Sequence, residues 1–258
     1  MKIALANLWR ACGVSPLECG TGIEAGQILV YVLPLNRGST EAVLPFLSND
    51  EKVRVACYGR ERDGRRFAVS RTLLRGVLAL HTDIDPGRLV FFEESLGRPY
   101  LMKVQANGLD FNLARRDDCS VIALGLNRRI GIDIESLRSA ILVESMRTML
   151  PAKDRAAIEA VCGLDRSKRL IAAWTSLEAR AKAIGTGLDD TAAKNSALEC
   201  QHFELDCKFI GCVAAEGRDW QLKLIRQEDR CVAFGYAHCI SNLRRVEYQT
   251  RQKIVDES

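Results

Sequence analysis

Residues 130–135, Ile-Gly-Ile-Asp-Ile-Glu, decide how the middle of this 258-residue chain folds. Isoleucine alternates with other residues, and a period of two is typical of a β-strand with one buried face. Asp133 and Glu135 then share the opposite face, about 7 Å apart, because each residue advances a strand by about 3.3 Å. Two carboxylates at that spacing repel each other, so the pattern predicts a compensating cation. Mg²⁺ is the natural candidate, since it takes oxygen ligands and commonly binds together with substrate phosphates.

A third carboxylate is expected on a helix further along the chain. Between residues 169 and 184, apolar side chains recur at steps of four and three residues, which predicts a helix with one core-facing stripe. The stripe consists of Leu170, Trp174, Leu177, Ala181 and Ile184. Glu178 and Lys182 lie one helical turn apart on a neighbouring strip. Gly185 follows the last periodic residue and predicts the end of the helix.

Composition is that of a globular protein, with 47% hydrophobic and 27% charged residues. The ten cysteines form no Cys-x-x-Cys pair, so we expect free thiols in a reducing compartment and a cytoplasmic location. The sequence contains no apolar run of about eighteen residues, and we expect no membrane span. Aromatic residues make up only 6% and no nucleic-acid-binding signature is present, so we expect no nucleic-acid partner.

Basic residues gather between residues 50 and 75, where eight Lys and Arg face four Asp and Glu. Much of this excess fits a solvated, salt-bridged helix face. Arg71 and Arg75 differ, because they fall one helical turn apart beside Phe67 and Leu74. Cationic groups next to an apolar surface suit a ligand that carries both phosphates and an adenine ring.

Five sequence blocks together resemble the 4'-phosphopantetheinyl transferases, specifically the larger, monomeric, two-lobed type that activates non-ribosomal peptide and polyketide synthases. Each block alone is weakly specific, but their order along the chain is that of the family. The blocks are Leu47-Ser48-x-x-Glu51-x-x-Arg54 with the basic residues after it, Gly97-Arg98-Pro99-Tyr100-Leu101, Phe111-Asn112-Leu113, Gly131-Ile132-Asp133-Ile134-Glu135, and Trp174 to Leu188 with Glu178, Lys182, Gly185 and Gly187.

The resemblance implies an α+β fold of two pseudo-symmetric lobes, each a helix packed on a small antiparallel sheet, with the ligand cleft between them. We expect an N-terminal extension over residues 1–26, an N-terminal lobe over 27–135 and a C-terminal lobe over 136–258. The chain is expected to act as a monomer.

The resemblance also implies an activity, the transfer of 4'-phosphopantetheine from coenzyme A to a serine of an acyl or peptidyl carrier protein, with release of adenosine 3',5'-bisphosphate. The expected Mg²⁺ ligands, with Mn²⁺ as a possible substitute, are Asp133, Glu135 and Glu178. Expected catalytic residues are Glu178, Asp154 and Lys182, where Glu178 or Asp154 is the candidate for the group that takes the serine proton. Expected contacts to coenzyme A are Arg54, Arg71, Arg75, Arg98, Asn112, Arg115 and Lys182, with Arg66 less certain.

Four positions depart from the family pattern. After Phe-Asn-Leu, the Ser-His-Ser of the family is replaced by Ala114, Arg115 and Arg116, and the Lys before the helical Glu is Leu177. In the family those Ser, His and Lys side chains help to bind the phosphates of coenzyme A. Arg115 keeps a positive charge and can bind phosphate with two hydrogen bonds, although it cannot release its proton. Leu177 falls on the apolar stripe, and we expect it at the edge of the core beside Glu178.

These departures leave two other hypotheses open. One is a catalytically poor relative that binds coenzyme A or a carrier domain as an interaction protein. The other, with less support, is an unrelated Mg²⁺-dependent nucleotide-binding domain. Taken alone, Glu178 and Lys182 fit a helix-surface ion pair worth a few tenths of a kcal/mol. Taken with the other blocks in family order, they favour a functional site.

Secondary structure is expected in both halves as helix followed by strands. The pattern predicts a hairpin of residues 121–126 and 129–135 around Asn127-Arg128. The remaining expected elements are strands at 27–35, 89–93, 101–104, 203–213, 220–226 and 231–238, and helices at 50–80 with a break at 59–64, 143–149, 152–162 and 165–184.

Overall fold

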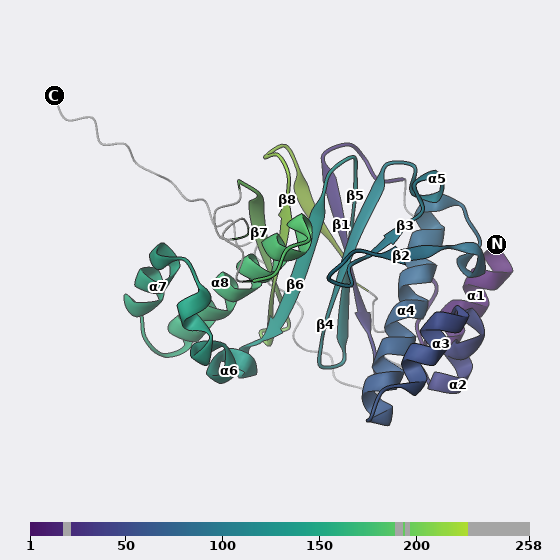
Figure 1. The fold of residues 1–258 in the computed structure, drawn as a ribbon, viewed down its shortest axis with the longest axis horizontal. Helices are drawn as coiled ribbons and strands as arrows, with labels where there is room; N and C mark the ends of the chain where they lie inside the picture. Colours follow the sequence, from purple (N-terminus) through teal and green to yellow (C-terminus); the bar gives the residue numbers. More distant parts are fainter. Residues whose placement is uncertain (18–21, 189–192, 194–196, 227–258) are drawn as a thin grey trace, which may run out of the picture. The chain divides into compact units, whose positions relative to one another are not determined.

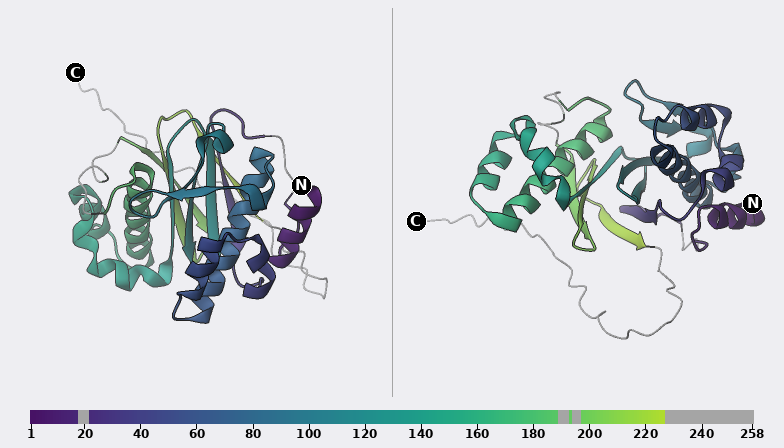
Figure 2. Two further views of the ribbon diagram at one scale, coloured as in Figure 1. Left: turned by 45° about the vertical axis from the view of Figure 1, so that its right-hand side comes forward. Right: turned by 90° about the horizontal axis from the view of Figure 1, so that it is seen from below.

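The computed structural model describes residues 1–17, 22–188, 193 and 197–226 (Figure 1). Two sheets pack against each other, and helices cover their outer faces (Figures 1 and 2). The helices are α1 Lys2–Ala11, α2 Thr40–Val43, α3 Asn49–Ala56, α4 Glu61–Thr82, α5 Lys103–Ala106, α6 Ala140–Ser145, α7 Ala152–Glu159 and α8 Gly163–Ile184. The strands are β1 Gln27–Pro34, β2 Phe91–Glu93, β3 Pro99–Leu101, β4 Leu109–Arg116, β5 Cys119–Leu126, β6 Ile130–Ser136, β7 Glu199–Leu205, β8 Phe209–Ala215 and β9 Gln221–Arg226.

The first sheet has the strand order β4-β5-β1-β9. Strands β4, β5 and β1 are antiparallel to one another, whereas β9 runs parallel to β1 with Tyr31 opposite Ile225. Helix α4 supplies most of the helical side of the core, because Leu73, Leu74, Val77 and Leu78 are fully buried. A break in this helical region is confirmed, but it lies at residues 57–60 and not at 59–64, because α4 already begins at Glu61. Helix α3 begins with a capping box in which Ser48 and Glu51 satisfy each other's backbone amides.

The second sheet has the order β6-β8-β7 and is antiparallel throughout. Helix α8 packs on it and ends at Ile184. The cap is Gly185, whose φ of 81° is the left-handed conformation that glycine adopts without penalty. The strand predicted at residues 129–135 and the helix predicted at 165–184 are therefore confirmed as β6 and α8. The strand, however, is buried on both faces, since its isoleucines face the first sheet and Asp133 is only 6% exposed.

The two sheets meet through a shared apolar cluster. Ile28 and Val30 of β1, and Val121 of β5, pack with Ile132 and Ile134 of β6. The side chains of β4 add polar links, because the backbone amides of Ile130 and Ile132 donate to Asp110 and Asn112. Strand β6 is thus held in place from both sides, by β8 on one edge and by side chains of β4 on the other.

The α+β architecture of small sheets and helices agrees with the predicted fold class, but several predicted strands were wrong. Strands β5 and β6 do not form a hairpin, since β5 pairs with β1 and β4 while β6 pairs with β8. The predicted strand over 203–213 is two strands joined by a turn at residues 206–208. Residues 103–104, predicted as strand, begin α5, and strand β4 was not predicted as an element. The strand predicted at 231–238 lies outside the described residues.

The N-terminal residues pack into the first core. Leu8 and Trp9 of α1 are buried against α4, and a Cβ built on Gly76 would lie 2.6 Å from the Trp9 ring. Helix α1 therefore contributes to the hydrophobic core of the first lobe. The division into residues 1–26, 27–135 and 136–258 stays a prediction. No helix within the described ranges is long and apolar enough to span a membrane.

Candidate active site

A cavity of about 460 Å³ is lined by two groups of elements that lie far apart in the sequence. Residues of α3, α4, β4 and the antiparallel pair β2–β3 form one side, and the last turns of α8 and the segment after it form the other. Its lining residues include Arg54, Phe67, Ser70, Arg71, Arg98, Asn112, Arg115, Glu178, Lys182 and Thr186. Most residues expected to contact the donor are thereby brought together, although they come from distant parts of the chain.

Asp133 and Lys182 form the central ion pair of this site, with Lys182 Nζ 2.6 Å from Asp133 Oδ1. Burial raises the pKa of Asp133, and the positive charge of Lys182 opposes that effect. Burial lowers the pKa of Lys182, but the charges of Asp133 and Glu178 outweigh it and leave that pKa raised. The second oxygen of Asp133, Oδ2, is buried with no hydrogen-bond partner among the described residues.

Glu178 stands beside this pair on α8. Burial is the main cause that raises its pKa. The charge of Lys182 opposes this effect, and the smaller contributions of Asp133 and Glu135 add to it. Asp133, Glu135 and Glu178 therefore share one electrostatic environment. Glu178 also lines the cavity, whereas Asp133 and Glu135 lie behind the lining.

Glu135 has a partner that the sequence did not suggest. Arg116, the last residue of β4, places Nε 3.1 Å from Glu135 Oε2, and Nη1 donates to Glu135 Oε1 at 3.4 Å. A further donor of the same guanidinium binds Ser139 Oγ. The sequence marked Arg116 only as a departure from Ser, because nothing local indicates that β4 and β6 lie side by side.

The carboxylates fit a divalent cation in their donor chemistry. Asp133, Glu135 and Glu178 offer only oxygen, which Mg²⁺ and Mn²⁺ prefer, and Asp133 Oδ2 is unpaired among the described residues. As placed, no group of three or more His, Cys, Asp or Glu side chains in the described part of the chain could hold a metal ion. Lys182 and Arg116 supply positive charge to Asp133 and Glu135 instead.

The opposite wall of the cavity is cationic and built around one aromatic ring. The guanidinium carbons of Arg54, Arg71 and Arg115 lie 5.1, 5.6 and 5.5 Å from the centroid of the Phe67 ring. Such contacts are favourable and orient the flat guanidinium groups. Arg115 is exposed, and no hydrogen bond or ion pair engages it among the described residues, so it is free to bind an anion.

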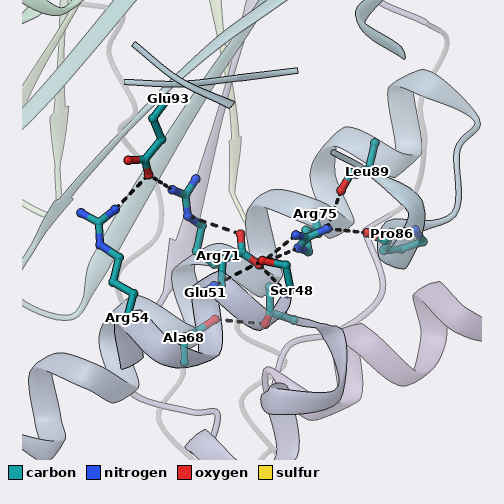
Figure 3. Close-up of polar contacts among 10 residues, drawn as sticks. Ser48, Glu51, Arg54, Ala68, Arg71, Arg75, Pro86, Leu89 and Glu93 are labelled. Atoms are coloured by element: carbon teal, nitrogen blue, oxygen red, sulfur yellow. Dashed lines mark hydrogen bonds and ion pairs between the residues drawn. The ribbon is translucent and has the colours of Figure 1, made fainter. Parts of the chain in front are cut away.

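Arg71, which lines the cavity, belongs to a chain of ion pairs with Glu93 and Glu51 (Figure 3). Glu93 binds Arg54 at 2.9 Å and Arg71 at 3.2 Å, while Glu51 binds Arg71 at 3.6 Å. Burial lowers the pKa of Arg71, and the two glutamates oppose that effect. Its Nη1 is buried without a hydrogen-bond partner in the described structure, which leaves one donor for a ligand.

Arg75 lies outside the cavity lining. Its guanidinium donates to Glu51 Oε2 at 2.8 Å and to the carbonyl oxygens of Pro86 and Leu89 (Figure 3). With its side chain 3% exposed, Arg75 ties α3 to α4 and to the segment before β2. The expected phosphate contact at Arg75 is therefore replaced by a structural role.

Arg98 and Asn112 line the cavity but are largely engaged within the protein. Arg98 Nη2 donates to both oxygens of Asp110 and to the carbonyl oxygens of Phe111 and Ile130. Its Nε is buried without a partner among the described residues. Asn112 Oδ1 accepts from the amide of Ile132, so both residues position the strand that carries Asp133.

Leu177 is deep in the core rather than at its edge. It is 1% exposed and packs in a cluster with Ile158, Leu170 and Trp174. The expectation of an edge position was wrong, because α8 turns this residue toward α6 and α7 and away from the cavity. Asp154 lies in the first turn of α7 and is not among the residues that line the cavity.

Two further residues line the cavity without a specific signal in the sequence. Ser70 lies between Phe67 and Arg71 on α4, and Thr186 stands between the two glycines that follow α8. Thr186 Oγ1 is buried without a hydrogen-bond partner among the described residues. The position of Thr186 inside the glycine block was the only available indication.

Similarity to known proteins agrees with this geometry. A family model described as "4'-phosphopantetheinyl transferase, N-terminal" matches residues 36–126, and one described as "4'-phosphopantetheinyl transferase superfamily" matches residues 129–235. The two matches meet between β5 and β6, and each contributes one wall of the cavity.

Individual relatives carry the same description. The 4'-phosphopantetheinyl transferase HetI of Nostoc sp. is 28% identical over 212 residues, which cover 80% of this chain and 86% of HetI. A putative 4'-phosphopantetheinyl transferase of Synechocystis sp. is 28% identical over 63% of this chain and 66% of its own. A phosphopantetheinyl transferase of Thraustochytrium sp. is 23% identical over 55% of this chain and 54% of its own. With two family models matched in order across both walls of the cavity, the chain belongs to the 4'-phosphopantetheinyl transferase superfamily.

Proposed function

We propose that this protein transfers 4'-phosphopantetheine from coenzyme A to a serine hydroxyl of an acyl or peptidyl carrier protein and releases adenosine 3',5'-bisphosphate. The observation that carries the proposal is the cavity itself. One of its walls carries three guanidinium groups, Arg54, Arg71 and Arg115, and the other carries Glu178 and Lys182 beside Asp133. Cations facing a carboxylate cluster suit a substrate with several phosphates that binds together with a divalent metal ion.

In this proposal, Asp133, Glu135 and Glu178 hold Mg²⁺, or Mn²⁺ in its place. Bound there, the ion would polarise the pyrophosphate and offset charge on the leaving group. Lys182 lies within reach of the same phosphates, because its side chain is 32% exposed and lines the cavity. With a metal ion bound at Asp133, the ammonium of Lys182 would no longer be the main counter-charge of this carboxylate. It could then bind phosphate oxygens of the donor.

Arg115, with Arg71 and Arg54, binds the remaining phosphates. Arg115 is the candidate for the 3'-phosphate, since it also borders a second cavity of about 330 Å³ together with Arg66 and Tyr58. Arg66 is already paired with Asp118 at 2.8 Å, so its contribution is secondary. Arg98 and Asn112 are proposed to act mainly by fixing the wall that faces the donor.

The reaction joins the serine Oγ to the phosphorus that carries the pantetheine arm. The bond from that phosphorus to the bridging oxygen breaks, and this oxygen leaves with adenosine 3',5'-bisphosphate. The serine proton passes to Glu178 or to a water beside it, because Glu178 is the acidic residue of the cluster that borders the cavity. Its raised pKa makes it a stronger base than an exposed glutamate.

The seven described cysteines are free thiols, which supports the further proposal that the protein works in the reducing cytoplasm. It is proposed to act there as a monomer, because both walls of the cavity come from one chain.

The deciding experiment uses the full chain with coenzyme A, Mg²⁺ and several apo carrier domains, and intact mass spectrometry of each carrier. We expect the addition of one phosphopantetheine group, and none on a carrier whose acceptor serine is replaced by alanine. If coenzyme A binds but no carrier is modified, a relative that acts as an interaction protein becomes the better proposal.

A further inference from the structure

The carboxylate cluster has a second built-in cation besides Lys182. Arg116 meets both oxygens of Glu135, at 3.1 and 3.4 Å, and is anchored at a third point by Ser139. Only the Nη1–Oε1 contact is a hydrogen bond, and the Nε–Oε2 contact is an ion pair, since neither of those two atoms has a hydrogen-bond partner among the described residues. Together with Ser139, these contacts hold the planar guanidinium, and its charge, at a fixed position beside Glu135. Glu135, in the second sheet, is thus held in one orientation by a residue of the first sheet.

The charge of Arg116 reaches beyond its partner. It opposes the burial-driven rise in the pKa of Glu135 and also acts on Asp133. Among the described residues, the cluster comprises three carboxylates, Asp133, Glu135 and Glu178, and two cations, Arg116 and Lys182. The formal net charge of the cluster is therefore −1. Without Arg116, the three carboxylates and Lys182 would have a formal net charge of −2, which would attract a metal ion more strongly.

A guanidinium does not lose its proton in proteins, so a change of pH does not remove this charge. A divalent cation must therefore displace Arg116 from Glu135 or bind in its presence, against electrostatic repulsion. Ser136, which follows Glu135, caps the next turn through the amide of Arg138, and that turn carries Ser139. Arg116 and its two partners consequently form one fixed unit at the end of β6.

We propose that Arg116 is a positioning residue that competes with the metal ion for Glu135 and so lowers the affinity of this site for divalent cations. The inference rests on the proposed metal site and adds to it a determinant of affinity. In this arrangement Asp133 and Glu178 are the carboxylates that can coordinate a metal ion most readily. Glu135 can coordinate the ion only in the fraction of molecules in which it has separated from Arg116.

The test is a titration of the full chain with Mn²⁺, with no donor or carrier present. Binding is measured by calorimetry and, independently, by the electron paramagnetic resonance signal of free Mn²⁺. We expect Arg116→Ser to bind Mn²⁺ about tenfold more tightly than the unchanged protein, the order expected when a unit charge a few ångströms away is removed. Arg116→Lys should bind with intermediate affinity, because it keeps the charge but an ammonium on a flexible stem cannot contact Glu135 and Ser139 in the same fixed geometry.

Arg128→Ser is the matched control, since it also removes an arginine paired with a carboxylate, Asp219, outside the cavity. Its Mn²⁺ affinity should equal that of the unchanged protein. Circular dichroism and thermal unfolding of each variant check that the fold is retained. Unchanged or weaker Mn²⁺ binding by a folded Arg116→Ser protein would overturn the inference and leave the metal site standing. Mn²⁺ binding that persists in Asp133→Asn would overturn the metal site itself, and the inference with it.

Discussion

The backbone of Gly131 in β6 lies directly against that of Ala179 in α8. A Cβ built on Gly131 would lie 1.9 Å from the Ala179 carbonyl oxygen and 2.5 Å from the amide nitrogen of Ala183. Real Cβ atoms do not approach backbone atoms so closely. Only glycine therefore lets α8 come near enough for Lys182 to reach Asp133 at 2.6 Å.

This contact predicts that Gly131→Ala separates α8 from β6. We expect a markedly lower melting temperature, because both partners at the clash are backbone, and a loss of transfer larger than the fraction of unfolded protein explains. Thermal unfolding and transfer assays at a temperature where the variant is folded measure the two effects. Gly59→Ala serves as control, since nothing lies within 4 Å of its added Cβ. A Gly131→Ala protein with unchanged stability would contradict the proposed packing.

Asp133→Asn should abolish most transfer while the protein stays folded. Asparagine has nearly the volume of aspartate, so it preserves packing at a site that is only 6% exposed, but it removes the charge needed for the metal and for Lys182. We expect a loss of at least about 10²-fold in turnover, comparable to removal of a charge-stabilising group at other active sites. Chelation by EDTA should act likewise, with Mg²⁺ or Mn²⁺ restoring activity and Zn²⁺ doing so poorly. Activity equal to that of the unchanged protein would remove Asp133 from the site.

Arg115→Ala should raise the apparent Michaelis constant for coenzyme A more than it lowers turnover. The side chain is exposed and unpaired among the described residues, so its loss removes binding that the ground state and the transition state share. Steady-state kinetics with coenzyme A and with a donor that lacks the 3'-phosphate test whether Arg115 acts on this phosphate. The substitution should raise the apparent Michaelis constant less for the second donor than for coenzyme A. Equal penalties for both donors would mean that Arg115 does not contact the 3'-phosphate.

Leu177→Lys should lower the melting temperature sharply and give no gain in affinity for coenzyme A. The side chain is 1% exposed, so the substitution buries an ammonium or forces α8 to repack, and truncations at such sites alone cost about 2–5 kcal/mol. Leu164→Lys on the same helix is the control, because Leu164 is 63% exposed. Tighter binding of coenzyme A by a stable Leu177→Lys protein would show that a lysine here can reach the cavity after all.

Glu178→Gln should stabilise the protein near neutral pH while it impairs transfer. Burial raises the pKa of Glu178 in the folded state above its ordinary 4.5, although the charge of Lys182 opposes this rise. The folded protein then holds this proton more tightly than the unfolded chain, so the charged form lowers stability above the folded pKa, and stability returns as the pH falls toward 4.5.

The gain in melting temperature of Glu178→Gln should therefore be largest above the raised pKa and shrink as the pH approaches 4.5. Thermal unfolding across this range in EDTA measures it, with the exposed Glu216→Gln as control. A Glu178→Gln protein that is less stable than the unchanged protein at neutral pH would show that the charged carboxylate does not destabilise the fold.

The local sequence pattern was sufficient to predict the parts of the site whose residues lie close together in the sequence. The alternation in residues 130–135 predicted a strand with Asp133 on the face opposite the isoleucines, and the spacing of Leu170, Trp174 and Leu177 predicted α8. Period and end signals depend on neighbouring residues alone, so they can be read from a single sequence. The same information placed Glu178 and Lys182 one turn apart on α8, beside its buried stripe.

Only the tertiary structure decided which strands pair and which charges meet. Strand β6 pairs with β8 instead of the adjacent β5, and Arg116 meets Glu135 because β4 lies alongside β6. Arg75 and Leu177 are turned into the interior, whereas their sequence neighbourhoods suggested the cavity and its edge. The physical reason is that these outcomes depend on packing between segments far apart in the chain. The period of a helix or strand states which residues share a face, but it does not state what covers that face.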